Sequence, residues 1–505
     1  MILAESTPEG ELPNIRIDEK DTGEMHLIER MQVKPTEKLS KICHFAKDIY
    51  NKANYILRHY FFMVIESEEV ALEWLKKAHH YLVSNPHDFD KIVKITKIFL
   101  KRAEKENKRK NDGESKLNWG WYYPQKGLNI SYYKLEKMLK HSPEYECMPA
   151  QSAQQTLKKL IADWKGYQKK TVNYWEKRKE LSHNEFKKRY AKPPNIPRYK
   201  KKDGEMVATF TNQQCKLKGE YLIFPGHTNS RNSPRWLPPL KVRFKGKFSQ
   251  VEIIPKNGIY IIGIIYLKKK KDLGLDKNRV SSIDIGVNNT IAMVDNIGSR
   301  PILVKGGIVK SINQYFNKVR AKLMSIKDKQ GYTHWTKRLK KLSLDRYNRL
   351  HDIFHKYSRR LIELCIEKNI GTLVIGYNET WKQGVNIGKR NNQNFVSIPF
   401  LVLLQKIKYK AELVGIKVII QEESYTSKCS FLDCEDIGKH RTYKGKRVKR
   451  GLFMSSDGRL INADVNAAYN IMRKAIPDVI FADGIEDIVV CPRCVNWLEP
   501  PHRKD

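Results

Sequence analysis

The spacing of hydrophobic and polar positions changes along the chain, and each change marks a different kind of predicted structure. Residues 14–34 alternate as an extended segment does. Thr36 then stands where it can cap a helix, and the apolar residues after it recur at helical spacing. Helical patterns continue to about Tyr190, with loops predicted near 84–88 and 111–127. The first part of the chain is therefore predicted to be mainly helical.

A proline-rich segment at 192–197 ends the helical region, because a helix cannot run through these prolines. From 207 to 267 the pattern is short, strand-like and punctuated by Gly and Pro. This region is predicted to be a small β-rich, barrel-like module.

The C-terminal part gives a regular succession of predicted elements. They are strands at 280–285, 291–294 and 301–304, helices at 311–326 and 347–368, a strand at 372–375, a helix at 398–414, a strand at 416–421 and a helix at 463–474. Three strands followed by alternating helices and strands is the order of an RNase H-like fold, here with an extra helical stretch after the third strand. The fold class predicted for the whole chain is α+β and multidomain, with a helical lobe, a β module and an RNase H-like α/β domain.

The same patterns predict domain boundaries. The expected parts are a strand segment of the β module at 1–34, a helical nucleic-acid recognition lobe at 35–192, the β-rich module at 193–275, a nuclease domain at 276–424 and 461–475, an inserted ribbon-like segment at 425–460, and a tail at 476–505.

The charge of the chain adds a class of partner to this picture. Lys and Arg number 95 against 55 Asp and Glu, a formal net charge of +40. Such an excess repels itself unless a polyanion offsets it, and nucleic acid is the expected polyanion. We expect no membrane association and a cytoplasmic location, because there is no apolar run long enough to span a bilayer and no signal peptide. Aromatic residues beside cations, as at 118–123 and 132–134, are typical of base stacking, although core packing explains any single one equally well.

Two aspartates stand where a nuclease of this fold would hold divalent cations. Asp284 ends an apolar strand, and Asp464 begins the last predicted helix. Taken singly, Asp284 could be a turn residue and Asp464 a helix cap. Together, in this order of elements and in a basic chain, they predict a shared site for two Mg²⁺ ions, which prefer oxygen ligands.

The third carboxylate is not in its simplest place. The strand at 372–375 runs into Gly376, where an acidic residue is expected, and Glu379 follows three residues late. The neighbouring predicted strand ends in Glu422 and Glu423, either of which could reach the same metals. Alternation points the two to opposite faces, and we favour Glu423.

The cysteines allow a second kind of metal site. Cys429 and Cys434 lie in the predicted insertion, and Cys491 and Cys494 in the tail. A structural zinc ion needs four ligands, which these two pairs could supply together, or with His440 in place of one cysteine. Zn²⁺ is therefore a possible second metal in what is otherwise a degenerate zinc ribbon. The basic segment 444–450, where a second local cysteine pair would be expected, is predicted to touch phosphates.

Several short motifs in the right order resemble those of transposon-encoded TnpB proteins and the compact type V CRISPR effectors related to them. The C-terminal motifs are SIDIGVNN at 282–289, VIGYN at 374–378, WKQ at 381–383, NNQNF at 391–395, ESYTSK at 423–428 and NADVNAAYNI at 462–471. Weaker matches are AKDIYNKANY at 46–55 and PAQSAQQ at 149–155.

The resemblance implies an RNA-guided DNA endonuclease. In that family a structured guide RNA binds the protein, the guide pairs with target double-stranded DNA, and a single Mg²⁺-dependent RuvC-type site cuts. The missing acid at Gly376 keeps a cleavage-deficient, RNA-guided DNA-binding protein open, and the fold alone also admits a transposase or resolvase. Whether the chain acts as a monomer or a homodimer stays open, as does the source of the guide.

Overall fold

The computed structural model describes residues 23–63, 132–190, 192–226, 235–378 and 398–498. They form two compact units, one spanning 26–268 and the other spanning 269–505 together with the start of the chain. Each unit is described by itself. Among the described residues, no helix combines the length and the apolar character needed to cross a bilayer. The loops predicted at 84–88 and 111–127, and the aromatic run 118–123, lie outside the described residues.

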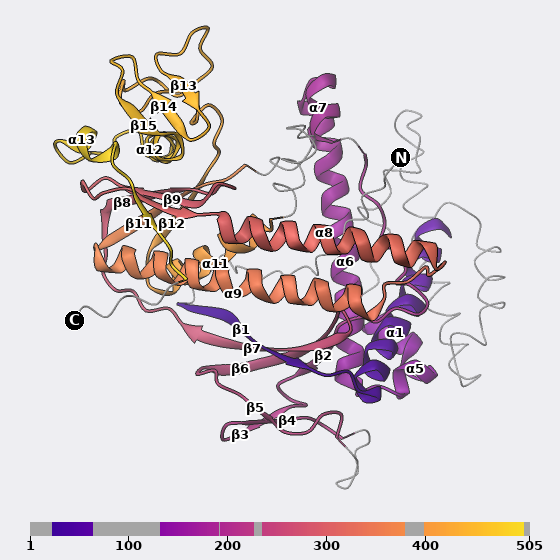
Figure 1. The fold of residues 1–505 in the computed structure, drawn as a ribbon. Helices are drawn as coiled ribbons and strands as arrows, with labels where there is room; N and C mark the ends of the chain where they lie inside the picture. Colours follow the sequence, from indigo (N-terminus) through magenta and orange to yellow (C-terminus); the bar gives the residue numbers. More distant parts are fainter. Residues whose placement is uncertain (1–22, 64–131, 191, 227–234, 379–397, 499–505) are drawn as a thin grey trace. The chain divides into compact units, whose positions relative to one another are not determined.

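In the first unit, one face of the first described helix is buried in the core, and two of the later helices pack against it (Figure 1). Thr36 accepts a hydrogen bond from Leu39 N at 3.3 Å, which confirms the predicted start of that helix. Deep in the core, Trp164 Nε1 donates to Asn54 Oδ1 at 3.0 Å, so that a buried amide and a buried indole satisfy each other. The helices are α1 (Glu37–Met63), α4 (Tyr132–Leu139), α5 (Pro143–Glu146), α6 (Ala150–Glu180) and α7 (His183–Arg189).

Two antiparallel sheets complete this unit. The larger sheet has the order β1-β7-β6-β2, so the first strand of the chain pairs with a strand more than 200 residues later. The smaller sheet has the order β3-β4-β5. The strands are β1 (Glu24–Val33), β2 (Ala208–Thr211), β3 (Lys216–Lys218), β4 (Tyr221–Ile223), β5 (Leu240–Lys241), β6 (Lys247–Lys256) and β7 (Ile259–Lys269).

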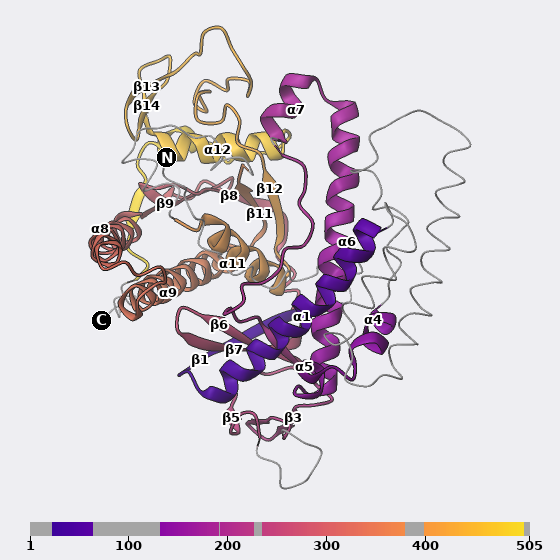
Figure 2. The same cartoon turned by 90° about the vertical axis from the view of Figure 1, so that its right-hand side faces the viewer.

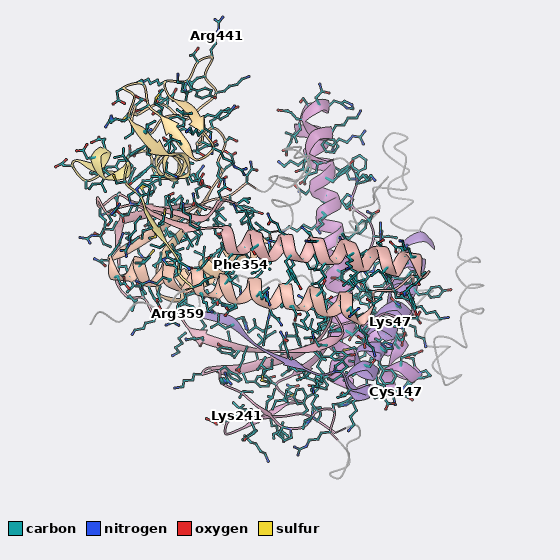
Figure 3. All side chains as sticks on the ribbon, in the orientation of Figure 1. Lys47, Cys147, Lys241, Phe354, Arg359 and Arg441 are labelled. Atoms are coloured by element: carbon teal, nitrogen blue, oxygen red, sulfur yellow. The ribbon has the colours of Figure 1, made fainter. Side chains whose placement is uncertain are left out.

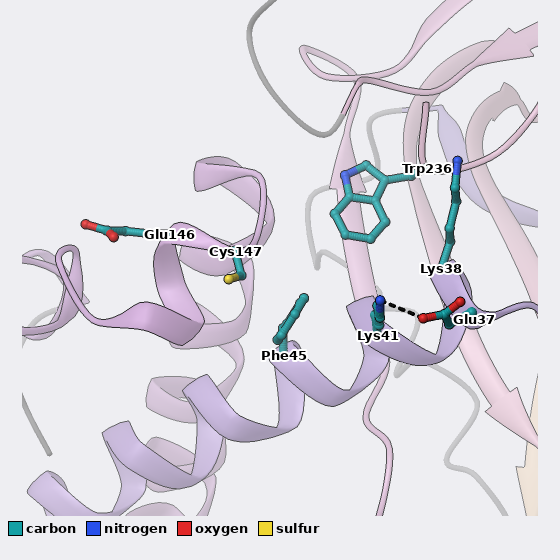
Figure 4. A pocket seen from close by; sticks show the side chains of 7 residues that line it. All are labelled: Glu37, Lys38, Lys41, Phe45, Glu146, Cys147 and Trp236. Atoms are coloured by element: carbon teal, nitrogen blue, oxygen red, sulfur yellow. Dashed lines mark ion pairs between the residues drawn. The ribbon is translucent and has the colours of Figure 1, made fainter. Parts of the chain in front are cut away.

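A pocket opens between the start of α1 and the segment that follows α5 (Figure 4). Phe45 and the indole of Trp236 line it, together with Cys147. At its rim, Lys41 forms an ion pair with Glu37 across 2.6 Å. The pocket thus combines aromatic walls with a polar rim.

The second unit is built on a six-stranded sheet with the order β12-β11-β8-β9-β10-β16. β9 is antiparallel to β8 and β10, whereas β11 is parallel to both β8 and β12. The strands are β8 (Asp276–Asp284), β9 (Asn289–Asp295), β10 (Ile302–Lys305), β11 (Ile370–Gly376), β12 (Lys417–Gln421) and β16 (Arg493–Val495). The first five strands follow the predicted order of elements.

Helices cover both faces of this sheet. Figure 2 shows α12 (Ala463–Ala475) along one face, and α9 (Lys337–Glu367) and α11 (Phe400–Leu413) on the other, as their contacts require. Neighbouring residues of β11 point alternately to the two faces of the sheet. Leu373 packs on the side of α9 and α11, and Val374 packs on the side of α12. Along α9, Phe354 is buried and Arg359 points outward (Figure 3). The helix α8 (Gly307–Lys329) packs beside α9.

The chain between β12 and α12 forms a small three-stranded sheet, β13 (Lys446–Lys449), β14 (Leu452–Met454) and β15 (Leu460–Asn462). After α12 come the short helix α13 (Ile485–Val489) and then β16, which pairs in parallel with β10. The segment predicted to be only a tail therefore supplies the sixth strand of the main sheet. Three residues are too few to show an alternating pattern, which is why the sequence did not reveal this strand.

Candidate active site

Asp284 ends the central strand of the six-stranded sheet. Its strand neighbours are fixed on both sides, since Asp284 pairs with Ala292 of β9 and Ile283 pairs with Ile375 of β11. The residues just before it are buried. Packing on both faces therefore sets the register that brings this carboxylate to the end of the strand.

Asp464 lies in the first turn of α12. The Asn462 side chain caps the helix by accepting hydrogen bonds from Asp464 N at 3.0 Å and Val465 N at 3.3 Å. Asn289, at the start of β9, donates from Nδ2 to Asp464 Oδ2 at 2.7 Å. The helix cap thus places the residue, and Asn289 orients its carboxylate.

Glu423 reaches the same region from the strand beside β11. Gly376 is paired with Gln421 of β12, and Tyr377 N donates to Gln421 O at 2.9 Å, so the two strand ends lie side by side. A Cβ atom on residue 376 would overlap Oε1 of Glu423. This oxygen is buried and has no hydrogen-bond partner among the described residues. The glycine therefore provides the space into which the glutamate side chain folds.

Glu422 takes a different direction. It forms an ion pair with Lys474 at 2.8 Å and accepts a hydrogen bond from Ser424 N at 2.8 Å. Burial alone would raise the pKa of Glu422, but hydrogen bonds from Lys474 and Ser424 outweigh it and hold the pKa below its usual value. Of the two glutamates, only Glu423 turns toward Asp284. Glu379 lies outside the described residues.

Asp284 interacts electrostatically with both of the other carboxylates. Burial, then the neighbouring Asp464, raises the pKa of Asp284 to about 7, while Arg447 acts in the opposite direction. Burial, then Asp284, raises the pKa of Glu423 to about 9. The cations that act in the opposite direction, Arg447 on Asp284 and Lys474 on Glu423, do not outweigh these effects. The cluster is an acidic site in which a cation would be stabilised.

Oxygen donors of this kind suit Mg²⁺, and the orphaned Oε1 of Glu423 is available to a ligand. In the described part of the chain, however, no group of three or more His, Cys, Asp or Glu side chains is arranged so that it could hold a metal ion as it stands. The donor set therefore fits the predicted metal, whereas the ligand geometry is not already formed.

The four cysteines considered for zinc do not form such a group either. Cys429 is buried, with its Sγ 3.7 Å from Gly438 O, while Cys434, Cys491 and Cys494 are exposed. Cys494 belongs to β16, at the edge of the main sheet. The two pairs do not come together in one group among the described residues, and zinc binding by these cysteines stays a prediction.

His440, the alternative zinc ligand, has its Nε2 2.7 Å from Asp436 O, within its own loop. It joins no metal-binding group among the described residues.

Two residues of the site were not singled out from the sequence. Asn289 is 6% exposed and contacts Asp464, yet in the sequence it looks like a turn residue after a glycine. Arg447 acts on the charge of Asp284 from the basic strand β13. The only sequence signal for Arg447 is the basic run 444–450, which does not tell which of its cations lies nearest the acidic site.

Family models match two parts of the second unit. Residues 268–382 match the OrfB_IS605 family, described as a probable transposase, and residues 400–471 match the Cas12f1-like TNB domain. Asp284 falls in the first match, and Glu423 and Asp464 fall in the second.

Similar proteins include the TnpB-like protein ORF457 of Acidianus two-tailed virus, with 28% identity over 40% of this chain and 43% of that protein. Cas12f1 of Sulfoacidibacillus thermotolerans, a CRISPR-associated endodeoxyribonuclease, is 24% identical over 81% of this chain and its own full length. Cas12f2 of a Micrarchaeota archaeon, another such nuclease, is 25% identical over 47% of this chain and 46% of its own. The chain thus covers less than half of two of these relatives.

Among solved structures, a Cas12f1–sgRNA–target DNA complex aligns with 90% of this chain and 99% of its own at 13% identity, with a TM-score of 0.31. A CRISPR-Cas12f ternary complex aligns with 88% of this chain and 82% of its own at 13% identity, with a TM-score of 0.32. The family models and the sequence relatives confirm the resemblance to TnpB and compact type V CRISPR proteins.

Proposed function

We propose that this chain is an RNA-guided DNA endonuclease whose single cutting site is formed by Asp284, Glu423 and Asp464. The observation that carries the proposal is that the buried Asp284 carboxylate interacts with both Glu423, from the end of a second strand, and Asp464, from the start of a helix. No lysine or arginine forms an ion pair with any of them among the described residues. Such an arrangement costs stability unless it serves to bind a cation.

The sheet supports an RNase H-like, RuvC-type assignment. Its strand order, read from β10 through β9, β8 and β11 to β12, is three antiparallel strands followed by two parallel ones. β8, β11 and β12 run parallel, so carboxylates at the ends of β8 and β12 lie at the same end of the sheet. The carboxylate on α12 belongs to that end as well. Glu423 would serve as the third carboxylate of the site, in place of the acidic residue expected at position 376.

Asp284, Glu423 and Asp464 would hold Mg²⁺, with Asn289 keeping the Asp464 carboxylate in place. When bound, the metal would activate a water molecule and stabilise the leaving oxygen. The carboxylates would have to draw together around the ion and release the protons that burial leads them to hold.

The proposed partners are a guide RNA and target double-stranded DNA. Two of the relatives are named as CRISPR-associated endodeoxyribonucleases, and the net charge of +40 requires extensive polyanion contact. Guide pairing supplies sequence specificity, so the protein needs mainly cationic surfaces. We assign residues 35–192, which the sequence predicts to be a helical lobe, to nucleic-acid recognition. In this unit, exposed Tyr133 and the Lys158 cation 4.7 Å above the Tyr132 ring suit such contacts.

One observation favours a second function, an RNA-guided DNA-binding protein that does not cut. The second acid is displaced from Gly376 to Glu423, and the described carboxylates do not form a ready-made metal group. If the ion cannot draw them together, guided binding would persist without cleavage.

The deciding experiment is expression of the chain with its native flanking DNA, followed by sequencing of the RNA that copurifies. The complex is then given Mg²⁺ and a plasmid that matches the guide, with randomised flanks, and Asp284→Ala serves as the control. Guide-dependent cutting that Asp284→Ala abolishes supports the nuclease. A defined RNA with target binding but no cutting supports the second function. Absence of any discrete RNA would contradict both and favour a transposase or resolvase.

A further inference from the structure

A chain of hydrogen bonds links Asp464 to a lysine on the neighbouring helix α8. Asn289 Nδ2 donates to Asp464 Oδ2 at 2.7 Å, and the next residue back, Asn288, accepts from Lys310 Nζ at 2.9 Å. The backbone of Asn288 is held as well, since Gly306 N donates to its carbonyl oxygen at 2.7 Å. Lys310 therefore stands beside the turn that orients Asp464.

The residue before Asp464 is tied to the turn between β13 and β14. Ala463 N, directly before Asp464, donates to Gly451 O at 3.1 Å. Gly451 has φ +98°, a backbone conformation that favours glycine and fixes the course of this turn. Arg450 precedes it and is exposed. Lys310 and Arg450, from distant segments, are thus each tied through neighbouring residues to the surroundings of Asp464.

These two cations are close enough for the charge of Arg450 to act on Lys310. Burial, then the charge of Arg450, lowers the pKa of Lys310. In the described part of the chain neither residue forms an ion pair, whereas Arg459, from the next turn, pairs with Asp457. Two like charges held close together are destabilising, and a bound anion removes that cost.

We propose that Lys310 and Arg450 together bind one backbone phosphate of the nucleic-acid strand that enters the carboxylate site. The inference rests on the proposed function, because it assigns a neighbouring phosphate to the strand that Asp284 and Asp464 act on. The cations also offset the repulsion between Asp464 and that strand, which would otherwise oppose entry. A phosphodiester of DNA or of RNA satisfies the same chemistry.

The test is acetylation footprinting of lysines on the full-length chain, purified in high salt to remove bound nucleic acid. Mass spectrometry compares the labelling of Lys310 with that of Lys322, an exposed lysine about 18 Å further along the same helix. The probes are a single-stranded DNA oligonucleotide, an RNA of the same sequence, and inorganic phosphate.

We expect the DNA oligonucleotide to reduce labelling of Lys310 several-fold and that of Lys322 little, and Arg450→Ala to remove most of this protection. Equal protection by RNA identifies the shared backbone as the ligand, and protection by DNA alone identifies DNA. Protection of Lys310 no greater than that of Lys322, or unaffected by Arg450→Ala, would overturn the proposal. Protection by inorganic phosphate alone would also overturn it, because the ligand would then not be a strand.

Matched variants give a second readout if the chain cuts DNA. Lys310→Ala and Arg450→Ala should raise KM more than they lower kcat, and Lys310→Arg should restore KM. Because the two cations share one phosphate, loss of either or both should reduce the dependence of log affinity on log salt by no more than about 0.7, the value for one phosphate of a single strand. Arg459→Ala, whose guanidinium is already paired with Asp457, is the control and should change neither.

The footprint separates this proposal from the nuclease assignment. Protection of Lys310 in a chain that never cuts would leave the phosphate site standing and remove the nuclease. Guide-dependent cutting without that protection would do the reverse.

Discussion

The Glu423 carboxylate fills the space in which a side chain on Gly376 would begin. The two residues are 47 positions apart in the sequence, but the pairing of Gly376 with Gln421 brings the ends of β11 and β12 together. A Cβ on residue 376 would overlap Glu423 Oε1 and lie 2.5 Å from Ile471 Cδ1. An acid at 376 and an acid at 423 in this conformation therefore exclude each other, which gives a physical reason for the displaced carboxylate.

The first prediction separates the two adjacent glutamates. Glu423→Gln should reduce guide-dependent cutting by more than the roughly 10–100-fold that loss of an outer-shell partner costs. The Glu422→Gln variant should cut at nearly the rate of the parent chain, because Glu422 is turned toward Lys474. Plasmid cleavage in Mg²⁺ measures both, with target binding as the control for folding. Equal losses in the two variants would contradict the assignment.

A second prediction concerns the space above Gly376. Gly376→Ala should destabilise the chain by about 1–3 kcal/mol, as overpacking of a filled site does, and should also reduce cutting because Glu423 is pushed aside. Thermal unfolding and cleavage assays check the two effects. The control adds Gly376→Ala to the Glu423→Ala variant, where it should destabilise the chain by less. The relief will be partial, since Ile471 still limits the space. An equal cost in both backgrounds would show that Glu423 does not occupy it.

Much of the fold could be predicted from the sequence, because local patterns carry it. The predicted helix at 463–474 agrees closely with α12, and the predicted strand at 280–285 matches the C-terminal part of β8, which begins at Asp276. The placement of Asp284 and Asp464 at element ends thus followed from apolar periodicity. Both elements are buried against neighbours on defined faces, which makes the pattern strong.

Local patterns do not predict how one strand aligns with its neighbour, or where a distant segment of the chain joins the sheet. The choice between Glu422 and Glu423 depends on how β12 aligns with β11, and alternation without the register leaves it open. The position of Cys494 depends on β16 returning to β10, nearly 200 residues earlier, so cysteine spacing could not reveal that the two pairs do not come together in one group among the described residues.

A third prediction tests Asn289 as a positioning residue. Asn289→Ala removes the donor to Asp464 Oδ2, and an outer-shell partner of this kind is worth roughly 10–100-fold in metal affinity or activity. The Mg²⁺ concentration for half-maximal cutting should rise, while the rate at saturating Mg²⁺ falls less. Asn289→Asp should be worse than alanine, because it adds a fourth negative charge. A lowered rate with an unchanged Mg²⁺ requirement would mean that Asn289 has only a structural role.

The fourth prediction concerns stability without metal. The pKa of Glu423 is raised in the folded state from 4.5 to about 9, and that of Asp284 from 3.8 to about 7. A raised pKa means that the folded state holds the proton more tightly than the unfolded state. The contribution of these groups is therefore fully present below pH 4 and is lost as pH rises toward 9.

Glu423→Gln, which cannot ionise, should consequently be more stable than the parent chain at pH 9 in a chelator. The difference should exceed about 1.4 kcal/mol, the equivalent of one pKa unit, and should shrink toward pH 5. Glu422→Gln is the matched control with the opposite sign, because the pKa of Glu422 is lowered and its loss should destabilise the chain at neutral pH. Thermal unfolding at the two pH values checks both variants. Adding Mg²⁺ should reverse the order of Glu423→Gln and the parent, since a ligand stabilises only the protein that binds it. If the parent stays less stable than Glu423→Gln in saturating Mg²⁺, the three carboxylates do not hold the ion, and the chain would be a guided binder rather than a nuclease.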